Sequence, residues 1–280
     1  RVLSGSVFVA LAAYSVISLA ALVFWAIDRT DFATHEFLKT VIVFSWWAAV
    51  PMLIIALVAR RWRLTVLILP SVAAFAIYYL VWFLPKTPQA PADAPRLSVA
   101  TFNLRHEQDG LAAIESLVRR MDADVLTLHE LSVEADAVIS VSLRDLYPHQ
   151  ATYPRSGQYT YVEGQGVYSK YPIIESDYWR DADLPLSHGH TRTVIDVDGV
   201  AVTVYSVHPW PSLWWRGSNL LRNFHLVYSA DYDRSHREAM QRIVTRLDAE
   251  PAAPLILMGD LNMSDQYTEY QQLAQRLTDA

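Results

Sequence analysis

Polar side chains follow four apolar stretches of this sequence, each at the point where a predicted strand ends. Asp260 and Asn262 are two positions apart after the run LILMG, so in an extended chain they project to the same side. Gly259 before them permits a close backbone approach or an unusual dihedral angle. Because loops and strand ends carry most functional sites, these groups indicate a site for a charged ligand. The residues are Asn103, Glu130, His208, Asp260 and Asn262.

The elements that must position these residues are read from residue 97 onward, where short apolar runs alternate with helical patterns. This alternation predicts a mixed α/β domain with two facing sheets and helices outside them, a four-layer α/β/β/α sandwich. Asp198-Gly199 predicts a hairpin turn. The predicted strands are 97–104, 124–131, 158–162, 166–169, 191–197, 200–207 and 255–258. The predicted helices are 110–122, 133–146, 233–247 and 267–277.

The N-terminal third has three long apolar runs. Residues 7–27 and 64–84 contain no charged residue, and residues 38–59 contain one, at position 39. A helix of ~20 residues crosses a hydrocarbon core of ~30 Å. The three runs therefore predict a transmembrane region of three helices in residues 1–84.

Charges in the connecting loops predict the orientation of these helices. The loop between the second and third runs contains Arg60, Arg61 and Arg63, whereas the loop 28–39 has three acids against two bases. Short basic loops stay in the cytoplasm. We therefore expect a multi-pass protein of the cell membrane with a cytoplasmic N-terminus and everything after residue 84 outside the cytoplasm.

Residues 85–96 carry four prolines and predict a linker between the membrane region and a domain in 97–280. Residues 1–96 have a net charge of +4, which leaves −10 for the rest within the total of −6. An acidic domain attracts nucleic acid phosphates poorly and suits a divalent cation. Nucleic acid is therefore a less favoured partner, and we expect no protein partner.

Six short stretches give the sequence a family resemblance. They are TFNL, DVLTLHE, GVYSKYPI, HTRT, YSVHP and LILMGDLN, spread in this order over roughly residues 97–265. Together they resemble the endonuclease/exonuclease/phosphatase superfamily, the Mg²⁺-dependent phosphoesterases that include DNase I-like nucleases, sphingomyelinases and inositol phosphatases.

The resemblance implies a role for each matching residue. Glu130 would be the principal ligand of Mg²⁺, or of Mn²⁺ in its place, with Asn103 close to the metal. Asp260 would orient or deprotonate the attacking water. His208 would donate to the phosphoryl oxygens or the leaving group. Asn262 would bind a phosphate oxygen, and Arg192 would help to order the site.

Two departures from the family pattern are visible. His129 stands where the family usually has Gln before the metal-binding Glu, and we expect its side chain to point away from that of Glu130. The family ends on an essential Asp-His pair on a last strand, whereas this sequence ends at Asp279-Ala280. We expect that the C-terminal part of the domain is missing.

Two further segments could contribute to a site. His188 and His190 in SHGH suggest either a transition-metal pair or, more simply, a solvated loop. The segment 209–228 is rich in aromatic residues, which suit a membrane interface or a cover for the core. Trp210 and Trp214 in this segment are candidate substrate-binding residues.

These observations predict a membrane-anchored phosphoesterase that acts outside the cytoplasm on a phosphate ester or pyrophosphate, with lipid-linked phosphates among the possible substrates. Two alternatives stay open. The first is an extracellular nuclease of the same superfamily. The second is a catalytically inactive, membrane-tethered binding module.

Overall fold

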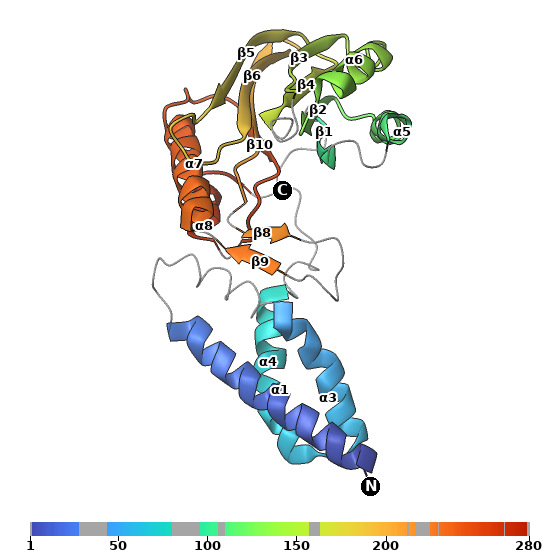
Figure 1. Cartoon of the computed structure of the whole chain (residues 1–280), viewed down its shortest axis with the longest axis vertical. Coiled ribbons are helices and arrows are strands. Elements are labelled where there is room, and N and C mark those ends of the chain that lie inside the picture. The colour runs from blue at the N-terminus through green and yellow to red at the C-terminus, as the bar shows by residue number, and fades with distance from the viewer. Residues whose placement is uncertain are drawn as a thin grey trace. The chain divides into compact units, whose positions relative to one another are not determined.

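The computed structural model describes the chain in nine stretches, coloured from the N- to the C-terminus in Figure 1. Internal contacts divide the chain into an N-terminal unit, residues 1–94 with 264–271, and a second unit, residues 95–263 with 272–280. The described stretches are 2–27, 44–79, 96–105, 110–156, 163–211, 213–216, 225–228, 230–265 and 267–278.

The N-terminal unit consists of apolar helices. They are α1 (Val2–Ile27), the short 3₁₀ helix η1 (Trp46–Ala48), α3 (Ala49–Val58) and α4 (Trp62–Tyr79). Large apolar side chains cover their outside, where a water-soluble helix would carry polar residues. These exposed side chains include Phe8, Ile17, Trp47, Ile54, Trp62 and Val66.

Serine side chains lie inside this helical unit. Ser15, Ser18 and Ser71 are buried, and the hydroxyl groups of Ser18 on α1 and Ser71 on α4 are hydrogen-bonded to each other. The outer surface of the unit is therefore apolar, and a few hydroxyl groups lie inside it among buried apolar side chains such as Leu11 and Ile68. Hydrogen bonds of this kind join helices in an apolar solvent.

Of the three membrane spans predicted from sequence, one has full length among the described residues. Gly5–Val23 is long and apolar enough to cross a membrane, and Trp46–Val58 and Trp62–Ile77 are shorter apolar helices. The predicted second and third runs continue into residues 38–43 and 80–84, which lie outside the described part of the chain.

The first sheet of the second unit has the strand order β1-β2-β4-β3. Strands β1 and β2, which correspond to the predicted strands 97–104 and 124–131, are parallel and end side by side. Asn103 on β1 lies beside His129 on β2. Both neighbours of β4 run antiparallel to it. The strands are β1 (Val99–Asn103), β2 (Val125–His129), β3 (His149–Tyr153) and β4 (Gln165–Ser169).

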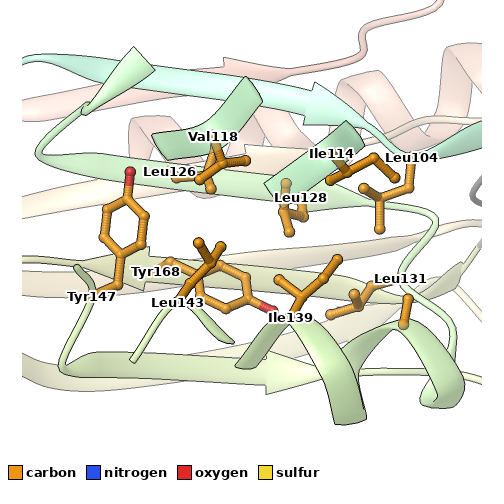
Figure 2. Close-up of a cluster of buried hydrophobic side chains, with 11 residues drawn as sticks. Leu104, Ile114, Val118, Leu126, Leu128, Leu131, Ile139, Leu143, Tyr147 and Tyr168 are labelled. Carbon is orange, nitrogen blue, oxygen red and sulfur yellow. The ribbon is translucent and has the colours of Figure 1, made fainter. Parts of the chain in front are cut away.

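Helices α5 (Leu111–Met121) and α6 (Val133–Ser142) cover the outer face of this sheet. Figure 2 shows their apolar side chains meeting those of β2 and β4. Ser132 starts α6, because its hydroxyl oxygen accepts a hydrogen bond from the Ala135 amide at 2.9 Å. The buried residues of this outer core include Ile114, Val118, Leu126, Leu128, Ile139 and Tyr168.

The second sheet has the order β10-β7-β6-β5 and is covered by α7 (Ala230–Asp248). The predicted hairpin at Asp198-Gly199 is confirmed, since it joins β6 to β7 and both residues have positive φ. Strand β10 runs parallel to β7, so these two strands also end side by side. The strands are β5 (Ile173–Arg180), β6 (Gly189–Val197), β7 (Val200–Val207) and β10 (Leu255–Gly259).

The two sheets pack face to face. Val125 and Val167 from the first sheet and Ile195, Val202 and Val204 from the second form one buried cluster. Alternation along β2 explains how, because Val125 faces the other sheet and Leu126 faces the helices. The order helices, sheet, sheet, helix is the predicted four-layer sandwich.

Several elements were not predicted from the sequence. Strands β3 and β5 were not predicted, and β4 pairs with β2 and β3. The predicted partner 158–162 lies outside the described residues. A hairpin of β8 (Leu213–Arg216) and β9 (His225–Tyr228) occurs in the segment expected to be a loop. The last predicted helix is short, α8 (Thr268–Ala274).

Candidate active site

The strand ends of the two sheets converge on the side chain of Asn103. Its Nδ2 atom donates to Glu130 Oε1 at 3.1 Å and to Asp260 Oδ2 at 3.1 Å. Glu130 follows β2 in the first sheet, and Asp260 follows β10 in the second. One amide group therefore joins two carboxylates that are 130 residues apart in sequence and belong to different sheets.

His208 and Asn262 extend this cluster. The Nε2 atom of His208 lies 3.9 Å from Asp260 Oδ2, and the His208 side chain is almost completely buried. Asp260 Oδ1 accepts a hydrogen bond from the main-chain N–H of Asn262 at 3.2 Å. The side-chain Nδ2 of Asn262 donates to the Pro209 carbonyl at 3.0 Å. The predicted set Asn103, Glu130, His208, Asp260 and Asn262 is thus brought together.

The backbone is strained where it delivers these side chains. Glu130 has φ 58°, Asn262 has φ 50° and Arg105 has φ 48°, values that are uncommon outside glycine. Gly259 has φ 143°, and a Cβ atom there would clash with the Val207 carbonyl oxygen on β7. Strain of this kind persists where surrounding structure enforces it and is concentrated at functional sites.

Behind this cluster lies a layer of buried histidines. The ring centroids of His129 and His208 are 5.4 Å apart, and those of His188 and His208 are 4.1 Å apart. His129 Nε2 lies 3.0 Å from the Thr101 hydroxyl, whereas Glu130 next to it is bound by Asn103. The two neighbours therefore have separate partners.

Burial sets the protonation of these histidines. It lowers the pKa of His129 to about 4, although the charge of Asp260 opposes this shift. Burial also lowers the pKa of His188 to about 3, with a smaller effect of His129 in the same direction. The pKa of His190 falls to about 3 for the same reason, aided by His188, His129 and Arg246. These three rings are neutral at physiological pH.

The structure does not bring Arg192 together with the cluster. Its guanidinium donates to Glu250 through Nε at 2.5 Å and Nη2 at 3.0 Å, and to Glu175 through Nη1 at 3.0 Å. The Tyr205 hydroxyl also donates to Glu250 at 2.6 Å. The Arg192 hydrogen bonds hold the pKa of Glu250 below its usual value. Arg192 thus joins β6 to Glu250, two residues after the end of α7.

The two predicted tryptophans belong to different parts of the chain, Trp210 to the segment after β7 and Trp214 to β8. The ring of Trp210 lies 4.6 Å from the His188 ring, and its carbonyl lies 2.8 Å from His236 Nδ1. Trp210 is therefore close to the histidine layer. Trp214 belongs to β8, and its side chain lies outside the described part of the structure.

The donor set at Asn103 fits a hard divalent cation. Glu130 and Asp260 both accept a hydrogen bond from the side-chain amide of Asn103. A cation bound at this point would attract the two carboxylates more strongly than the amide does. Mg²⁺ prefers few protein oxygens and retains several waters. The described residues contain no cluster of three or more His, Cys, Asp or Glu side chains suited to a metal. The oxygen donors of Glu130, Asp260 and Asn103 suit a hard cation such as Mg²⁺ or Mn²⁺ better than a softer ion such as Zn²⁺ or Cu²⁺.

Sequence reasoning missed the residues that support the cluster from behind. His188 and His190 are buried, so the expected solvated loop is wrong. Gln165 is also buried and donates to the Gly189 carbonyl at 2.8 Å. The pattern SHGH at the start of a predicted strand was the available signal, since Gly between two histidines at a strand end allows close packing.

A two-sheet α/β sandwich with carboxylate, amide and histidine side chains at its strand ends defines a class of hydrolytic enzymes. The chain belongs to the endonuclease/exonuclease/phosphatase family, whose family model matches residues 100–280. No curated protein matched the sequence.

Solved structures similar to this chain include three proteins of low sequence identity. Sphingomyelinase C from Streptomyces griseocarneus is 21% identical, with 65% of this chain and 70% of that chain covered and a TM-score of 0.49. A beta toxin variant from Staphylococcus aureus with bound magnesium ions is 17% identical (65% and 70% covered, TM-score 0.47). Humanized TDP2 from D. rerio is 13% identical (63% and 66% covered, TM-score 0.48).

Cation binding by the cluster is testable without any substrate. Glu130→Gln removes one of the two negative charges that face Asn103, so we expect Mn²⁺ affinity to fall at least tenfold, roughly the loss of one good ligand. Titration calorimetry measures this directly. Glu134→Gln is the matched control, because Glu134 is exposed on α6. Equal affinities of the wild-type and Glu130→Gln chains would contradict the assignment.

The buried histidines predict acid sensitivity. An unfolded His has a pKa of about 6.5, whereas His188 and His190 have folded values of about 3. The unfolded chain therefore takes up protons first, and stability is lost as the pH falls from about 6.5 toward 3. We expect the free energy of unfolding of the second unit to drop by about 2–4 kcal/mol between pH 7 and pH 5.

Urea titrations at each pH measure this drop. His190→Asn removes one of the three buried neutral rings, leaving His129 and His188, and should reduce the slope of stability against pH by about a third. A free energy of unfolding that does not change between pH 7 and pH 5 would be inconsistent with neutral, buried rings.

Proposed function

We propose that this protein is a metal-dependent phosphoesterase anchored in a membrane by its N-terminal helices. The observation that carries this proposal is the pair of hydrogen bonds from Asn103 Nδ2 to Glu130 and Asp260. They gather carboxylates from both sheets at one point. Two carboxylates this close repel each other, so a cation bound between them is favoured.

Glu130 and Asn103 would hold the Mg²⁺ or Mn²⁺ ion. When bound, the ion neutralises charge on the phosphoryl oxygens of the substrate. The strained conformation at Glu130 and the short parallel pairing of β1 with β2 fix these two side chains before substrate arrives. A preorganised site loses little energy to rearrangement during the reaction.

Asp260 would act on a water molecule. Its side chain is 38% exposed, while the neighbouring His208 side chain is 2% exposed. One oxygen of Asp260 accepts a hydrogen bond from Asn103, and the side chain is also accessible to solvent. A group that orients or deprotonates water must be accessible in this way. His208 Nε2, 3.9 Å from Asp260, would donate a hydrogen bond to the phosphoryl oxygens or to the leaving group.

We assign Asn262 a role next to His208 and Arg192 an indirect role away from the cluster. Asn262 holds the Pro209 carbonyl, so it fixes the segment that starts with His208, and its amide remains a candidate contact for a phosphate oxygen. Arg192 would order the site indirectly, through Glu250 and the packing of β6 on α7. Neither role requires Arg192 to touch substrate.

A membrane anchor is supported by the apolar outer surface of the N-terminal unit. The outer surfaces of α1, α3 and α4 carry exposed apolar side chains, while serine hydroxyls are paired inside. With the sequence runs that extend to residues 59 and 84, three spans fit this unit. Arg60 lies in the tight, exposed turn between α3 and α4, with φ 52°.

The anchor suggests the substrate class. An enzyme held at a bilayer meets lipid-linked phosphates and pyrophosphates at high local concentration. The net charge of −10 outside the membrane region disfavours nucleic acid as substrate. We therefore propose a lipid-linked phosphate ester or pyrophosphate, with Trp210 and Trp214 as candidate contacts.

Loss of Asp260 should abolish most hydrolysis. We expect Asp260→Asn and Glu130→Gln to lower kcat at least 100-fold in the presence of Mg²⁺, as for removal of a principal catalytic group. The assay uses a phosphomonoester, a phosphodiester, a polyprenyl pyrophosphate and DNA. Asp177→Asn is the control, because Asp177 is exposed on β5.

The substrates that are hydrolysed distinguish the proposed phosphoesterase from a nuclease and from an inactive binding module. Hydrolysis of the polyprenyl substrate supports the proposal, and hydrolysis of DNA alone would favour a nuclease. Near wild-type rates in either variant would remove the assigned roles. A wild-type chain that hydrolyses none of the four substrates would favour the inactive binding module.

Membrane orientation can be measured with single cysteines, because the chain has none of its own. We expect Arg60→Cys to be protected from an impermeant maleimide in intact cells, since the basic turn stays in the cytoplasm. Asp177→Cys in the second unit should be labelled under the same conditions. Labelling of Arg60→Cys together with protection of Asp177→Cys would reverse the proposed topology.

A further inference from the structure

The segment Ser187–His190 is not used by the proposed reaction, yet it lies directly behind His208. His188 is 2% exposed and His190 is completely buried. Burial of a polar ring costs free energy unless its contacts compensate for the lost hydration. Their contacts with the segment 208–210 indicate what they do.

His190 holds the backbone of His208. Its Nδ1 atom accepts a hydrogen bond from the His208 amide at 3.1 Å. The proton of the His190 ring therefore resides on Nε2. Because burial keeps the ring neutral, Nδ1 is available as an acceptor. The residue assigned as hydrogen-bond donor to the substrate is thus fixed through its own main chain.

His188 supports the His208 side chain. The centroid of its ring lies 4.1 Å from that of the His208 ring and 4.6 Å from that of the Trp210 ring. The His208 ring is bounded by His188 and His129, while its Nε2 atom lies 3.9 Å from Asp260. Packing on these sides limits the rotation of the ring away from Asp260.

The glycine between the two histidines is locked in place. Gln165 Nε2 donates to the Gly189 carbonyl at 2.8 Å, and the Ser206 hydroxyl donates to Gln165 Oε1 at 3.2 Å. A Cβ atom at position 189 would clash with the Glu163 carbonyl and the Tyr178 ring. The start of β6 is therefore tightly packed at Gly189, where a residue with a side chain would not fit, and both histidines are attached to this fixed backbone.

We propose that His188 and His190 are positioning residues for His208, with His190 fixing its main chain and His188 its ring. This inference rests on the proposed function, in which His208 contacts the phosphoryl group. It assigns to SHGH a role that is neither metal binding nor a solvated loop. A small displacement of a catalytic group is enough to lower a rate strongly.

A pair of substitutions at position 190 separates positioning from folding. Asn carries an acceptor oxygen on Cγ, where His has Nδ1, whereas Leu has similar bulk and no acceptor. We expect His190→Leu to lower kcat at least tenfold with KM within about twofold. His190→Asn should keep kcat within about threefold of the wild type. His149→Leu, on β3, is the matched control for a histidine-to-leucine change.

A second measurement does not depend on activity. Hydrogen exchange of the His208 amide reports its bond to His190, so we expect protection in the wild type and His190→Asn and faster exchange in His190→Leu. Fast exchange in His190→Leu with an unchanged kcat would overturn the positioning role. Equal exchange in all three chains would also overturn it.

These results separate the two hypotheses. A wild-type chain with no phosphoesterase activity contradicts the proposed function, and the amide measurement then decides the positioning of His208 alone. Activity that is retained in the wild type and equally in His190→Leu contradicts the positioning and leaves the proposed function standing. Equal loss in His190→Leu and His190→Asn would show a packing role only and would overturn the inference.

Discussion

The site depends on one shared donor, the Nδ2 atom of Asn103, which lies 3.1 Å from a carboxylate of each sheet. Two negative groups approach each other only if something electropositive stands between them. The sandwich supplies the geometry, because strands of both sheets end at the same side of the domain. The sheet interface thus serves both the stability of the domain and the assembly of Glu130 and Asp260 around one point.

Polar groups continue from this point into the space between the sheets. The apolar contacts of Val125 and Val204 hold the sheets together farther from the strand ends. Closer to the site the same layer contains Thr101, His129 and Gln165, which are linked by hydrogen bonds to neighbouring strands. The interior therefore changes from apolar to polar toward the site, and hydrogen-bonded side chains lie behind the proposed catalytic residues.

Much of this arrangement could be predicted from the sequence. The polar ends of strands that include Asn103 and Asp260 were visible as breaks in apolar runs, and the hairpin at Asp198 followed from turn chemistry. Strand β3 was not predicted, because HQATY lacks a clear alternation and is only partly buried. Arg192 lies in the motif HTRT, but its alternation on β6 turns it toward Glu250. His190 could not be placed, since only the folded contact with the His208 amide reveals its role.

The central claim is that Asn103, Glu130 and Asp260 surround one divalent cation. Anomalous diffraction from crystals of the full chain grown with Mn²⁺ tests this claim most directly. We expect a manganese peak within coordination distance of Glu130 and beside Asn103, with Asp260 as a direct or water-mediated neighbour. A peak elsewhere in the domain, or no peak at this cluster at millimolar Mn²⁺, would contradict it.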